Sequence, residues 1–370
     1  MATMNVLAIV SYPFLPATTG GEICTFGLHN ELAKTNEVTV FTVEPYSEKF
    51  TQPNFELLAK MPFKPTRYIN IFVFFTIKKL IKEKHIDLLF IEQTWYGWLL
   101  WLLKIFTDKK IYIRAHNIEH LRFKSIGKTW WKLLFYYEKW TYNAADKVFF
   151  LTEEDRQKAV DVFKLAVSKT QVIPYGIDLA QIPLKEANAV YNVKQLHHIK
   201  PEENILLFYG TMGYKPNNDA VLYLLEKLQP ALQKFPQFHY KIVVCGKNLP
   251  LTIEQKIKAN PSIIYAGFVE NLNEYIDAAK VVLNPVITGG GVKTKAIDAL
   301  ARNANLVSTE SGAIGIEKSV CGNKLIIVPD NDVNFFAQAI IKTCDAPLTN
   351  IPNQFYQTYN WGNIIKRLEL

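Results

Sequence analysis

The stretch Asn284-Pro-Val-Ile-Thr-Gly-Gly-Gly-Val-Lys-Thr-Lys-Ala-Ile-Asp-Ala-Leu300 carries the strongest signal in the sequence. An apolar strand pattern over 280–284 leads into three consecutive glycines, and a helical pattern follows them directly. Glycine has no Cβ, so a ligand can approach the backbone closely and φ is free to be positive. The N-terminus of the next helix adds unpaired N–H groups and the positive end of its dipole. This strand–loop–helix unit therefore predicts a site for a phosphate or diphosphate.

Charged residues in the same stretch strengthen this interpretation. Lys293 and Lys295 fall in the first turn of the expected helix, where they would add positive charge beside the anion. Asp298, farther along the helix, has the reach and the acceptor atoms for sugar hydroxyls. The alternative is a glycine-rich connection before an ordinary amphipathic helix. Two lysines and an acid at this spacing favour the ligand site.

Strand and helix patterns alternate along the whole chain. Expected strands cover 5–11, 38–43, 88–92, 111–115 and 147–151 in the first half, and 205–209, 240–245, 263–266, 281–283, 305–308 and 325–328 in the second. Apolar strands joined through helices form parallel sheets with right-handed crossovers. The chain of 370 residues is also too long for one ordinary core. We therefore predict an α/β protein of two Rossmann-like units, with ligands at the carboxyl ends of the strands.

Local signals give the expected helix boundaries. A helix over 22–34 should follow a loop that contains Gly20 and Gly21, and Thr152-Glu-Glu-Asp155 is a capping box that opens another helix. A further helix is expected over 219–234. The polar, weakly periodic stretch between Asp178 and about Glu203 is interpreted as the connection between the two units.

Composition limits the class of protein. Hydrophobic residues make up 49% of the chain and charged residues 21%, as in globular proteins. The four cysteines are scattered without a CxxC pair, which argues against structural zinc or a disulfide framework and fits a reducing compartment. No signal peptide is read at the start of the chain, and the longest apolar runs are shorter than the roughly 20 residues of a spanning helix. We expect a cytoplasmic protein.

The positive charge is concentrated in the first half. The net charge is +8, of which residues 1–176 carry +6 and the remainder +2. Lysines in that half are interleaved with aromatic residues over 78–84, 95–101 and 128–140. Such helices suit an anionic membrane surface, so peripheral attachment to the inner face of a membrane is expected. The alternative is core aromatics beside solvated lysines. No nucleic-acid partner is expected, because no nucleic-acid-binding motif accompanies the charge.

Several segments, in order along the chain, resemble the retaining GT-B glycosyltransferases of family four, also called group 1 transferases. The segments are Gly20-Gly21, Arg114-Ala-His116-Asn-Ile-Glu119, Ile173-Pro-Tyr-Gly-Ile-Asp178, Gly210-Thr-Met-Gly-Tyr-Lys-Pro216-Asn217-Asn-Asp-Ala220, Gly267-Phe-Val269, the glycine stretch at 285–295, and Val307-Ser-Thr309 with Gly312-Ala-Ile-Gly315. The resemblance implies an acceptor-binding domain over 1–175 and a nucleotide-sugar-binding domain over 176–348, which face each other across a cleft. It also implies a C-terminal helix within 349–370 that crosses back to the first domain, for which 355–370 would serve.

The resemblance also implies which residues hold the donor. In this family, backbone N–H groups and basic side chains balance the charge of the leaving diphosphate without a metal, and no cofactor is expected. The implied donor-binding residues are Gly20, Gly21, Gly210, Val269, Gly289, Gly290, Gly291, Val292, Lys293, Thr294, Lys295 and Asp298. The usual acidic pair of the family, Glu-x7-Glu, is replaced here by Gly290 and Asp298. The glycine version is a recognised variant, and aspartate shortens the arm towards the ribose hydroxyls.

His116 is the second catalytic candidate beside Lys293. It follows the strand at 111–115, where a cleft would lie, and the family places a histidine there near the transferred sugar. In a retaining reaction the acceptor attacks from the face that the nucleotide leaves, so His116 would hydrogen-bond the sugar rather than act as a conventional base. His120 is interpreted as structural. Asp330-Asn-Asp332 imitates a metal-binding motif, but it follows a strand in a polar context and is interpreted as a turn.

These observations favour a retaining, metal-independent hexosyltransferase. It would move a sugar from a UDP- or GDP-linked donor to an acceptor hydroxyl on a lipid-linked molecule or polysaccharide, in the assembly of a surface polysaccharide or glycolipid. Two alternatives remain. One is a GT-B nucleotide-sugar epimerase, which would need a pair of acid–base carboxylates that the sequence does not identify. The other is a catalytically silent partner subunit, which the residues at positions 290 and 298 allow.

Overall fold

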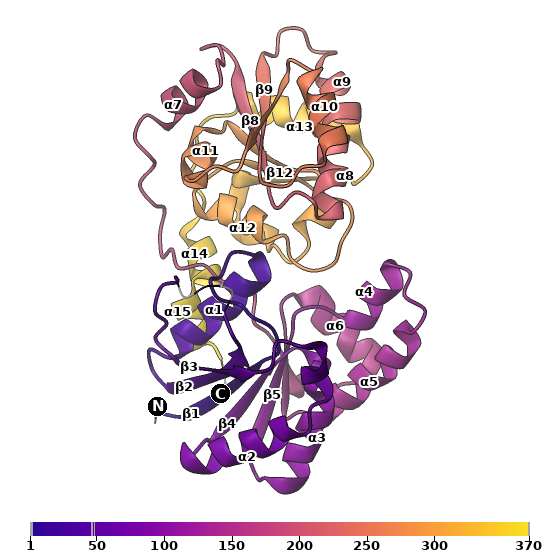
Figure 1. Cartoon of the computed structure of the whole chain (residues 1–370). Helices are drawn as coiled ribbons and strands as arrows, with labels where there is room; N and C mark the ends of the chain where they lie inside the picture. Colours follow the sequence, from indigo (N-terminus) through magenta and orange to yellow (C-terminus); the bar gives the residue numbers. More distant parts are fainter. Residues whose placement is uncertain (1–2, 46, 48, 369–370) are drawn as a thin grey trace. The chain divides into compact units, whose positions relative to one another are not determined.

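The computed structural model of the chain describes residues 3–45, 47 and 49–368. The chain divides into two compact units (Figure 1). The first comprises the chain up to Asp178 together with the chain from Tyr359 onward, and the second spans Leu179–Thr358. Among the described residues, no helix is both long enough and apolar enough to cross a bilayer.

The first unit is built on a seven-stranded parallel sheet with the order β3-β2-β1-β4-β5-β6-β7. Its strands are β1 (Asn5–Val10), β2 (Glu37–Val43), β3 (Glu56–Met61), β4 (Leu88–Glu92), β5 (Lys110–Ala115), β6 (Lys147–Phe150) and β7 (Thr170–Val172). Its central strands are continuous apolar runs with almost no exposed surface, because helices cover both faces of the sheet. The parallel sheet predicted from the sequence is confirmed, whereas its two edge strands, β3 and β7, were not expected.

Helices of the first unit divide between the two faces of this sheet. They are α1 (Gly20–Leu32), α2 (Phe72–Glu83), α3 (Gly97–Phe106), α4 (Glu119–Ser125), α5 (Trp131–Ala144), α6 (Glu153–Phe163) and the short turns η1 (Pro65–Ile69), η2 (Thr94–Tyr96) and η3 (Val167–Lys169). Helices α2, α3, α5 and α6 share one core cluster with odd-numbered residues of β1, β4 and β5. Side chains alternate along a strand, so the even-numbered residues of β4 face the other side. On that side His29 of α1 packs against Phe90.

Helix α1 begins earlier than the sequence indicated. The carboxylate of Glu22 accepts hydrogen bonds from the backbone N–H groups of Thr18, at 2.9 Å, and Thr19, at 2.8 Å. This arrangement fixes Thr19 as the N-cap, as in a capping box. Gly20 and Gly21 therefore lie in the first helical turn and not in the preceding loop, which corrects the expectation. The helix start expected at Thr152 is confirmed, since Thr152 is the N-cap of α6 and its hydroxyl accepts from the N–H of Asp155 at 3.0 Å.

The second unit has a six-stranded parallel sheet with the order β10-β9-β8-β11-β12-β13. Its strands are β8 (Asn204–Tyr209), β9 (Tyr240–Cys245), β10 (Ile263–Gly267), β11 (Val281–Asn284), β12 (Leu306–Thr309) and β13 (Leu325–Val328). Its helices and turns are α7 (Ala189–Leu196), α8 (Lys215–Tyr223), the π-helical η4 (Leu224–Leu228), α9 (Gln229–Leu232), α10 (Leu251–Lys258), α11 (Leu272–Ala278), α12 (Thr294–Ala301), η5 (Ser311–Ala313), η6 (Lys318–Val320), η7 (Gly322–Lys324), α13 (Val333–Asp345) and α14 (Asn353–Tyr359). All six expected strands are confirmed.

Two segments of the second unit differ from expectation. Helix α8 begins at Lys215 and not at Asp219, because Pro216 fits the first turn, where a helix needs no proline N–H. The stretch expected to be a polar connection contains α7, which packs against α11. Ala189 and Val193 of α7 are buried, so the stretch is part of the second unit's fold.

The C-terminal segment forms two short helices where one was expected. Helix α14 ends at Tyr359 and α15 covers Trp361–Lys366, with Asn360 between them as the N-cap of α15. In the first unit, the indole of Trp361 fills space left by two glycines. A Cβ on Gly27 would lie 2.2 Å from Trp361 Nε1, and one on Gly176 would lie 2.3 Å from Trp361 Cδ2. These glycines therefore let α15 pack closely against α1.

This packing gives a test of the fold. Gly27→Ala should lower the free energy of unfolding by about 1–3 kcal/mol, because the methyl group overlaps the indole. Gly21→Ala is the matched control in the same helix, since a Cβ there meets nothing within 4 Å. It should leave stability unchanged or slightly raised, because alanine favours helix. Urea unfolding of both variants measures the difference, and equal stabilities would show that α15 does not depend on Gly27.

Candidate functional site

Most of the residues predicted to hold a donor in the second unit lie along the carboxyl edge of its sheet. Gly210 follows β8, Val269 follows β10, and the glycine loop follows β11. Neighbouring backbones support this edge: Gly210 N–H donates to Cys245 O at 3.1 Å, and Gly246 N–H donates to Gly267 O at 2.7 Å. Parallel strands end at the same edge, so one side of the sheet carries all these loops.

The glycine loop uses the conformational freedom of its glycines. Gly289 has φ +85° and Gly291 has φ +72°, values that other residues rarely tolerate. A Cβ on Gly289 would lie 3.0 Å from the ring of Pro216 and 3.1 Å from the hydroxyl of Tyr214. The loop therefore packs against the start of α8 and leads into α12, whose N-cap is Lys293.

Lys293 turns its ammonium group back onto this loop. Its Nζ donates to the carbonyl oxygens of Gly289 at 2.9 Å, Gly291 at 3.0 Å and Gly290 at 3.4 Å. Burial lowers the pKa of Lys293 to about 8. A diphosphate beside the loop would offer this cation a stronger, charged acceptor than the three carbonyl groups.

Lys295 lies between β8 and α8. Its Nζ donates to Asn217 Oδ1 at 3.0 Å and lies 4.1 Å from the ring centroid of Phe208. Burial, and then the charge of Lys293, lowers the pKa of Lys295 to about 7. The two lysines thus form a half-buried cationic pair whose protonation responds to pH in the neutral range.

Asp298 lies in the second turn of α12, on the same helix as Lys295. Burial, and then the negative charge of Asp298, raises the pKa of Tyr209 well above its usual value. The Tyr209 hydroxyl donates to the backbone oxygen of Lys295 at 2.6 Å. This bond ties the end of β8 to the start of α12, which fixes the helix beneath the glycine loop.

The first unit carries a buried polar cluster at the carboxyl edge of its own sheet. Glu92 is the last residue of β4, and it is fully buried on the face covered by α1. Its Oε2 lies 2.5 Å from His116 Nε2, and its Oε1 lies 2.9 Å from His29 Nε2. Arg114 Nη1 donates to the same Oε1 at 3.4 Å. His116 is thereby attached to the sheet through Glu92.

Electrostatics keep this carboxyl group ionised. Burial alone would raise the pKa of Glu92, but the Arg114 guanidinium and His116 hold it well below its usual range. Arg114 in turn contacts Cys24, with Nη2 2.7 Å from Sγ. Burial raises the pKa of the Cys24 thiol, so Glu92 is the anion that balances the guanidinium.

His116 is identified as a candidate from the sequence, whereas no sequence pattern assigns a role to Glu92, Arg114 or His29. One signal was present: β4 reads Leu-Leu-Phe-Ile-Glu, a buried apolar strand that ends on an acid. Its partners lie 22 and 63 residues away in the sequence, so only the sheet and α1 bring them together.

Other polar residues considered in the sequence form hydrogen bonds that stabilise helix starts and a turn. Glu138 of α5 accepts from the N–H groups of Glu119 and His120 at 2.7 and 2.9 Å, and from His120 Nδ1 at 2.7 Å. His120 thus helps fix the start of α4, as expected for a structural histidine. Asp330 accepts from Ser311, and Asp332 caps α13 by accepting from Phe335 N–H at 2.9 Å. The turn predicted at 330–332 is confirmed.

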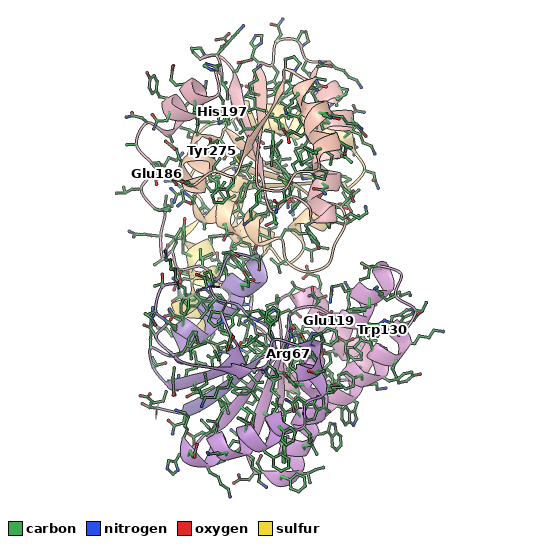
Figure 2. The ribbon with its side chains drawn as sticks, viewed as in Figure 1. Arg67, Glu119, Trp130, Glu186, His197 and Tyr275 are labelled. Atoms are coloured by element: carbon green, nitrogen blue, oxygen red, sulfur yellow. The ribbon has the colours of Figure 1, made fainter. Side chains whose placement is uncertain are left out.

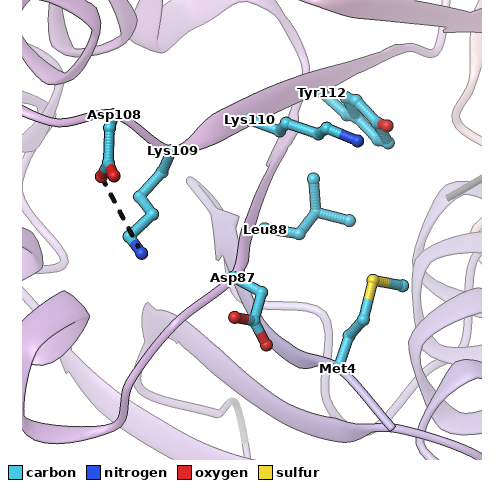
Figure 3. Close-up of a pocket in the computed structure, with 7 residues that line it drawn as sticks. All are labelled: Met4, Asp87, Leu88, Asp108, Lys109, Lys110 and Tyr112. Atoms are coloured by element: carbon cyan, nitrogen blue, oxygen red, sulfur yellow. Dashed lines mark ion pairs between the residues drawn. The ribbon is translucent and has the colours of Figure 1, made fainter. Parts of the chain in front are cut away.

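A pocket elsewhere in the first unit does not coincide with these residues. It measures about 240 Å³ and is lined by Met4, Asp87, Leu88, Asp108, Lys109, Lys110 and Tyr112 (Figure 3). These residues lie at the amino ends of β1, β4 and β5, whereas His116 follows the carboxyl end of β5. Ligands of parallel α/β sheets bind at the carboxyl ends, so this pocket is not the candidate site.

Each of the two units matches a glycosyltransferase family model. Residues 18–181 match the family model "Glycosyltransferase Family 4", and residues 203–346 match "Glycosyl transferases group 1". One relative, an uncharacterized 44.6 kDa protein in the cps region of Klebsiella pneumoniae, is 28% identical over 252 residues. That match covers 65% of this chain and 58% of the relative, so it spans little more than half of the relative's length.

Solved structures share the fold at low sequence identity. Sucrose-phosphate synthase from Thermosynechococcus elongatus has a TM-score of 0.74 at 18% identity, covering 98% of this chain and 97% of that one. Anabaena Alr3699/HepE, solved in complex with UDP and glucose, has a TM-score of 0.68 at 14% identity, covering 98% of both chains. WaaG, a glycosyltransferase involved in lipopolysaccharide biosynthesis, has a TM-score of 0.62 at 14% identity, covering 99% of this chain and 96% of that one.

The expected resemblance and fold class are both confirmed. Each unit has the parallel Rossmann-like sheet of a GT-B protein, and each matches the family model of one domain of such a protein. The chain belongs to the group 1, family 4 glycosyltransferases with the GT-B fold.

Proposed function

We propose that this protein transfers a sugar from a nucleoside-diphosphate sugar to an acceptor hydroxyl with retention of configuration and without a metal ion. The observation that carries the proposal is the glycine loop, with its two positive-φ glycines and the paired lysines at the start of α12. Anabaena HepE, which has a similar fold, was solved with UDP and glucose, and this supports a UDP-linked donor.

The donor would bind along the carboxyl edge of the second sheet. The diphosphate would accept from the backbone N–H groups of 290–294 and from the ammonium groups of Lys293 and Lys295. Asp298 would accept from the ribose hydroxyls, and the backbone at Gly210 and Val269 would border the nucleotide. The first-turn N–H groups of Gly20 and Gly21 would complete the phosphate contacts once donor is bound.

The chemical step breaks the bond between the anomeric carbon and the diphosphate oxygen. The acceptor oxygen forms the new bond on the same face, and its proton passes to the departing diphosphate. Positive charge near the diphosphate stabilises the leaving group as the bond breaks. His116, which presents a ring nitrogen other than the one bound to Glu92, would hydrogen-bond a hydroxyl of the transferred sugar.

Two other functions can be separated from this one by simple measurements. A catalytically silent partner subunit would gain no thermal stability from UDP, GDP or other nucleoside diphosphates. A nucleotide-sugar epimerase would bind them but would change the sugar without an acceptor. Thermal shift with a nucleotide panel, followed by product analysis with labelled donor, distinguishes the three.

Removing the cationic pair tests the donor site. Lys293→Ala or Lys295→Ala should weaken UDP or GDP binding by about 1–3 kcal/mol, because each variant loses a charge-assisted contact. Lys258→Ala removes an exposed lysine at the end of α10; it is the matched control and should bind as wild type does. Calorimetric titration measures the affinities. Turnover that disappears in EDTA and returns with a divalent ion would contradict a metal-independent site.

Nucleotide affinity should also depend on pH. The pKa of Lys295 is lowered to about 7 in the free protein, so the group is largely neutral above that pH. A diphosphate favours the protonated form, and binding must therefore take up a proton. Affinity should fall as pH rises from 7 to 9, above the phosphate's own pKa of about 6. Titration in buffers of different ionisation enthalpy measures the proton uptake, which Lys295→Met should reduce. Uptake unchanged in Lys295→Met would contradict this role.

We further propose that the acceptor is lipid-linked and that the protein works at an anionic membrane. Support comes from a surface of the first unit that we term the aromatic face. It consists of exposed side chains of α2, α3, α5 and the residue before α5: Phe72, Phe75, Trp101, Ile105, Phe106, Trp130, Leu133, Tyr136 and Trp140. Figure 2 labels Trp130 at the outer end of α5. These side chains are exposed, so they are not the core aromatics of the alternative interpretation.

Contacts between helices make this face continuous. The rings of Trp101 and Trp140 stack with centroids 5.0 Å apart and join α3 to α5. Lys78 Nζ lies 5.2 Å from the ring centroid of Phe106 and joins α2 to α3. A groove of about 600 Å³ runs beside the stacked pair and includes Lys104 and Lys139. Aromatic rings with lysine ammonium groups beside them suit the headgroup region of an anionic leaflet.

Co-sedimentation with vesicles tests this surface. Binding should rise with the fraction of anionic lipid and fall with added salt, because exposed charges are screened. The double variant Lys128→Glu with Lys132→Glu should abolish most of the vesicle binding. Each lysine contributes about 1 kcal/mol of attraction to anionic headgroups, and each glutamate is repelled by them. Lys227→Glu with Lys234→Glu makes the same charge change in the second unit and should bind as wild type does. A protein that ignores anionic vesicles at low salt would have a soluble acceptor or a protein partner on this face.

A further inference from the structure

We infer that Glu92 is a positioning residue, which sets the tautomer and the orientation of His116. The effect of this positioning on catalysis rests on the function proposed above. The assignment of the His116 tautomer does not depend on that function. The observation is a single buried carboxylate that binds two histidines and an arginine at the carboxyl edge of the first sheet.

Hydrogen-bond chemistry assigns the protons. An ionised carboxylate only accepts hydrogen bonds, so each ring nitrogen beside it must carry a hydrogen. Oε2 lies 2.5 Å from His116 Nε2, and Oε1 lies 2.9 Å from His29 Nε2. Both histidines are therefore Nε2–H tautomers when neutral. The Nδ1 of His116 then holds a lone pair that can accept a hydrogen bond from a sugar hydroxyl.

The surroundings of Glu92 fix it more firmly than one bond would. Its backbone pairs with Val10 of β1 on one side and with Arg114 of β5 on the other. Its Oε1 is held by His29 and Arg114, so that Oε2 points at His116. A histidine anchored in this way presents Nδ1 in a fixed direction, which a hydrogen bond to a reacting sugar requires.

A second buried Glu–His pair in the same unit provides a contrast. Glu138 binds His120, but it also caps the start of α4 through two backbone N–H groups. The His120 ring packs between Phe135 and Phe163, with centroids 5.1 and 5.4 Å away. His116 instead follows the end of β5, and its ring meets the edge of Tyr12 at 6.4 Å. The Glu92 pair thus joins the carboxyl ends of β4 and β5 themselves, whereas the Glu138 pair joins α4 to α5.

The test compares Glu92→Gln with Glu138→Gln as the matched control. A glutamine can donate to His116 Nε2, which would move the ring hydrogen to Nδ1 and reverse the polarity offered to the sugar. Nitrogen-15 NMR of the histidine side chains reads the tautomer directly, with the His116 signal assigned from His116→Gln. We expect the Nε2–H signal of His116 to be lost in Glu92→Gln and kept in Glu138→Gln.

Kinetics provide the second measurement. In Glu92→Gln, kcat should fall by about ten-fold or more while nucleotide affinity changes less than about two-fold, since a wrong tautomer affects the chemical step. Glu138→Gln should reduce thermal stability but not the kcat of the folded protein. If Glu92→Gln does not fold, Glu92→Asp can be used instead. Aspartate keeps the negative charge that pairs with Arg114, but its side chain is too short to hold both histidines. This variant should show mixed His116 tautomers and a similar loss of kcat.

Three results would overturn the inference. They are an unchanged His116 tautomer in Glu92→Gln, wild-type kcat in Glu92→Asp, or losses of kcat that are equal in the Glu92 and Glu138 variants. A wild-type protein that transfers no sugar would contradict the proposed function alone, because the tautomer measurement needs no turnover.

Discussion

Parallel pairing of strands is the constraint on which the rest of this structure depends. Parallel strands end together, so each sheet gathers the loops that follow its strands along one edge. In the second unit this edge carries Gly210, the glycine loop and Val269. In the first unit it carries Glu92 and His116, from adjacent strands β4 and β5. Residues far apart in the sequence become neighbours only because the strands share a direction.

The two units bury charge by different means. Taking an ion out of water is costly unless it is paired or becomes neutral. Glu92 is paired with Arg114 and two histidines, and it stays ionised. Lys295 has an amide oxygen and an aromatic ring beside it, and its pKa falls to about 7. A paired ion is fixed in place, whereas a partly neutral lysine can gain a proton when an anion arrives. The first arrangement suits positioning and the second suits binding.

Sequence patterns predicted most of the fold because they are local. Strand periodicity and the glycine stretch identified both sheets and the loop after β11.

Helix starts were less predictable: α1 begins at Gly20 because Glu22 and Thr19 bond to each other, and α8 begins at Lys215 because Pro216 fits its first turn. Strands β3 and β7 were missed because both are edge strands with partly exposed residues, and β7 has only three residues. The Glu92 cluster was missed because its bonds join β4, β5 and α1. The exposed position of Trp101 and Trp140 could also be read only from the structure, because their sequence pattern fits a core role equally well.

The central claim is that this chain transfers sugar from a nucleoside-diphosphate sugar with retention. The most direct test is to incubate the protein with a panel of UDP- and GDP-linked sugars and lipid-linked acceptors, and to follow the anomeric proton by NMR. We expect that one donor is consumed, that nucleoside diphosphate is released, and that the product has the anomeric configuration of the donor. A product of inverted configuration, or an epimerised donor without transfer, would contradict it.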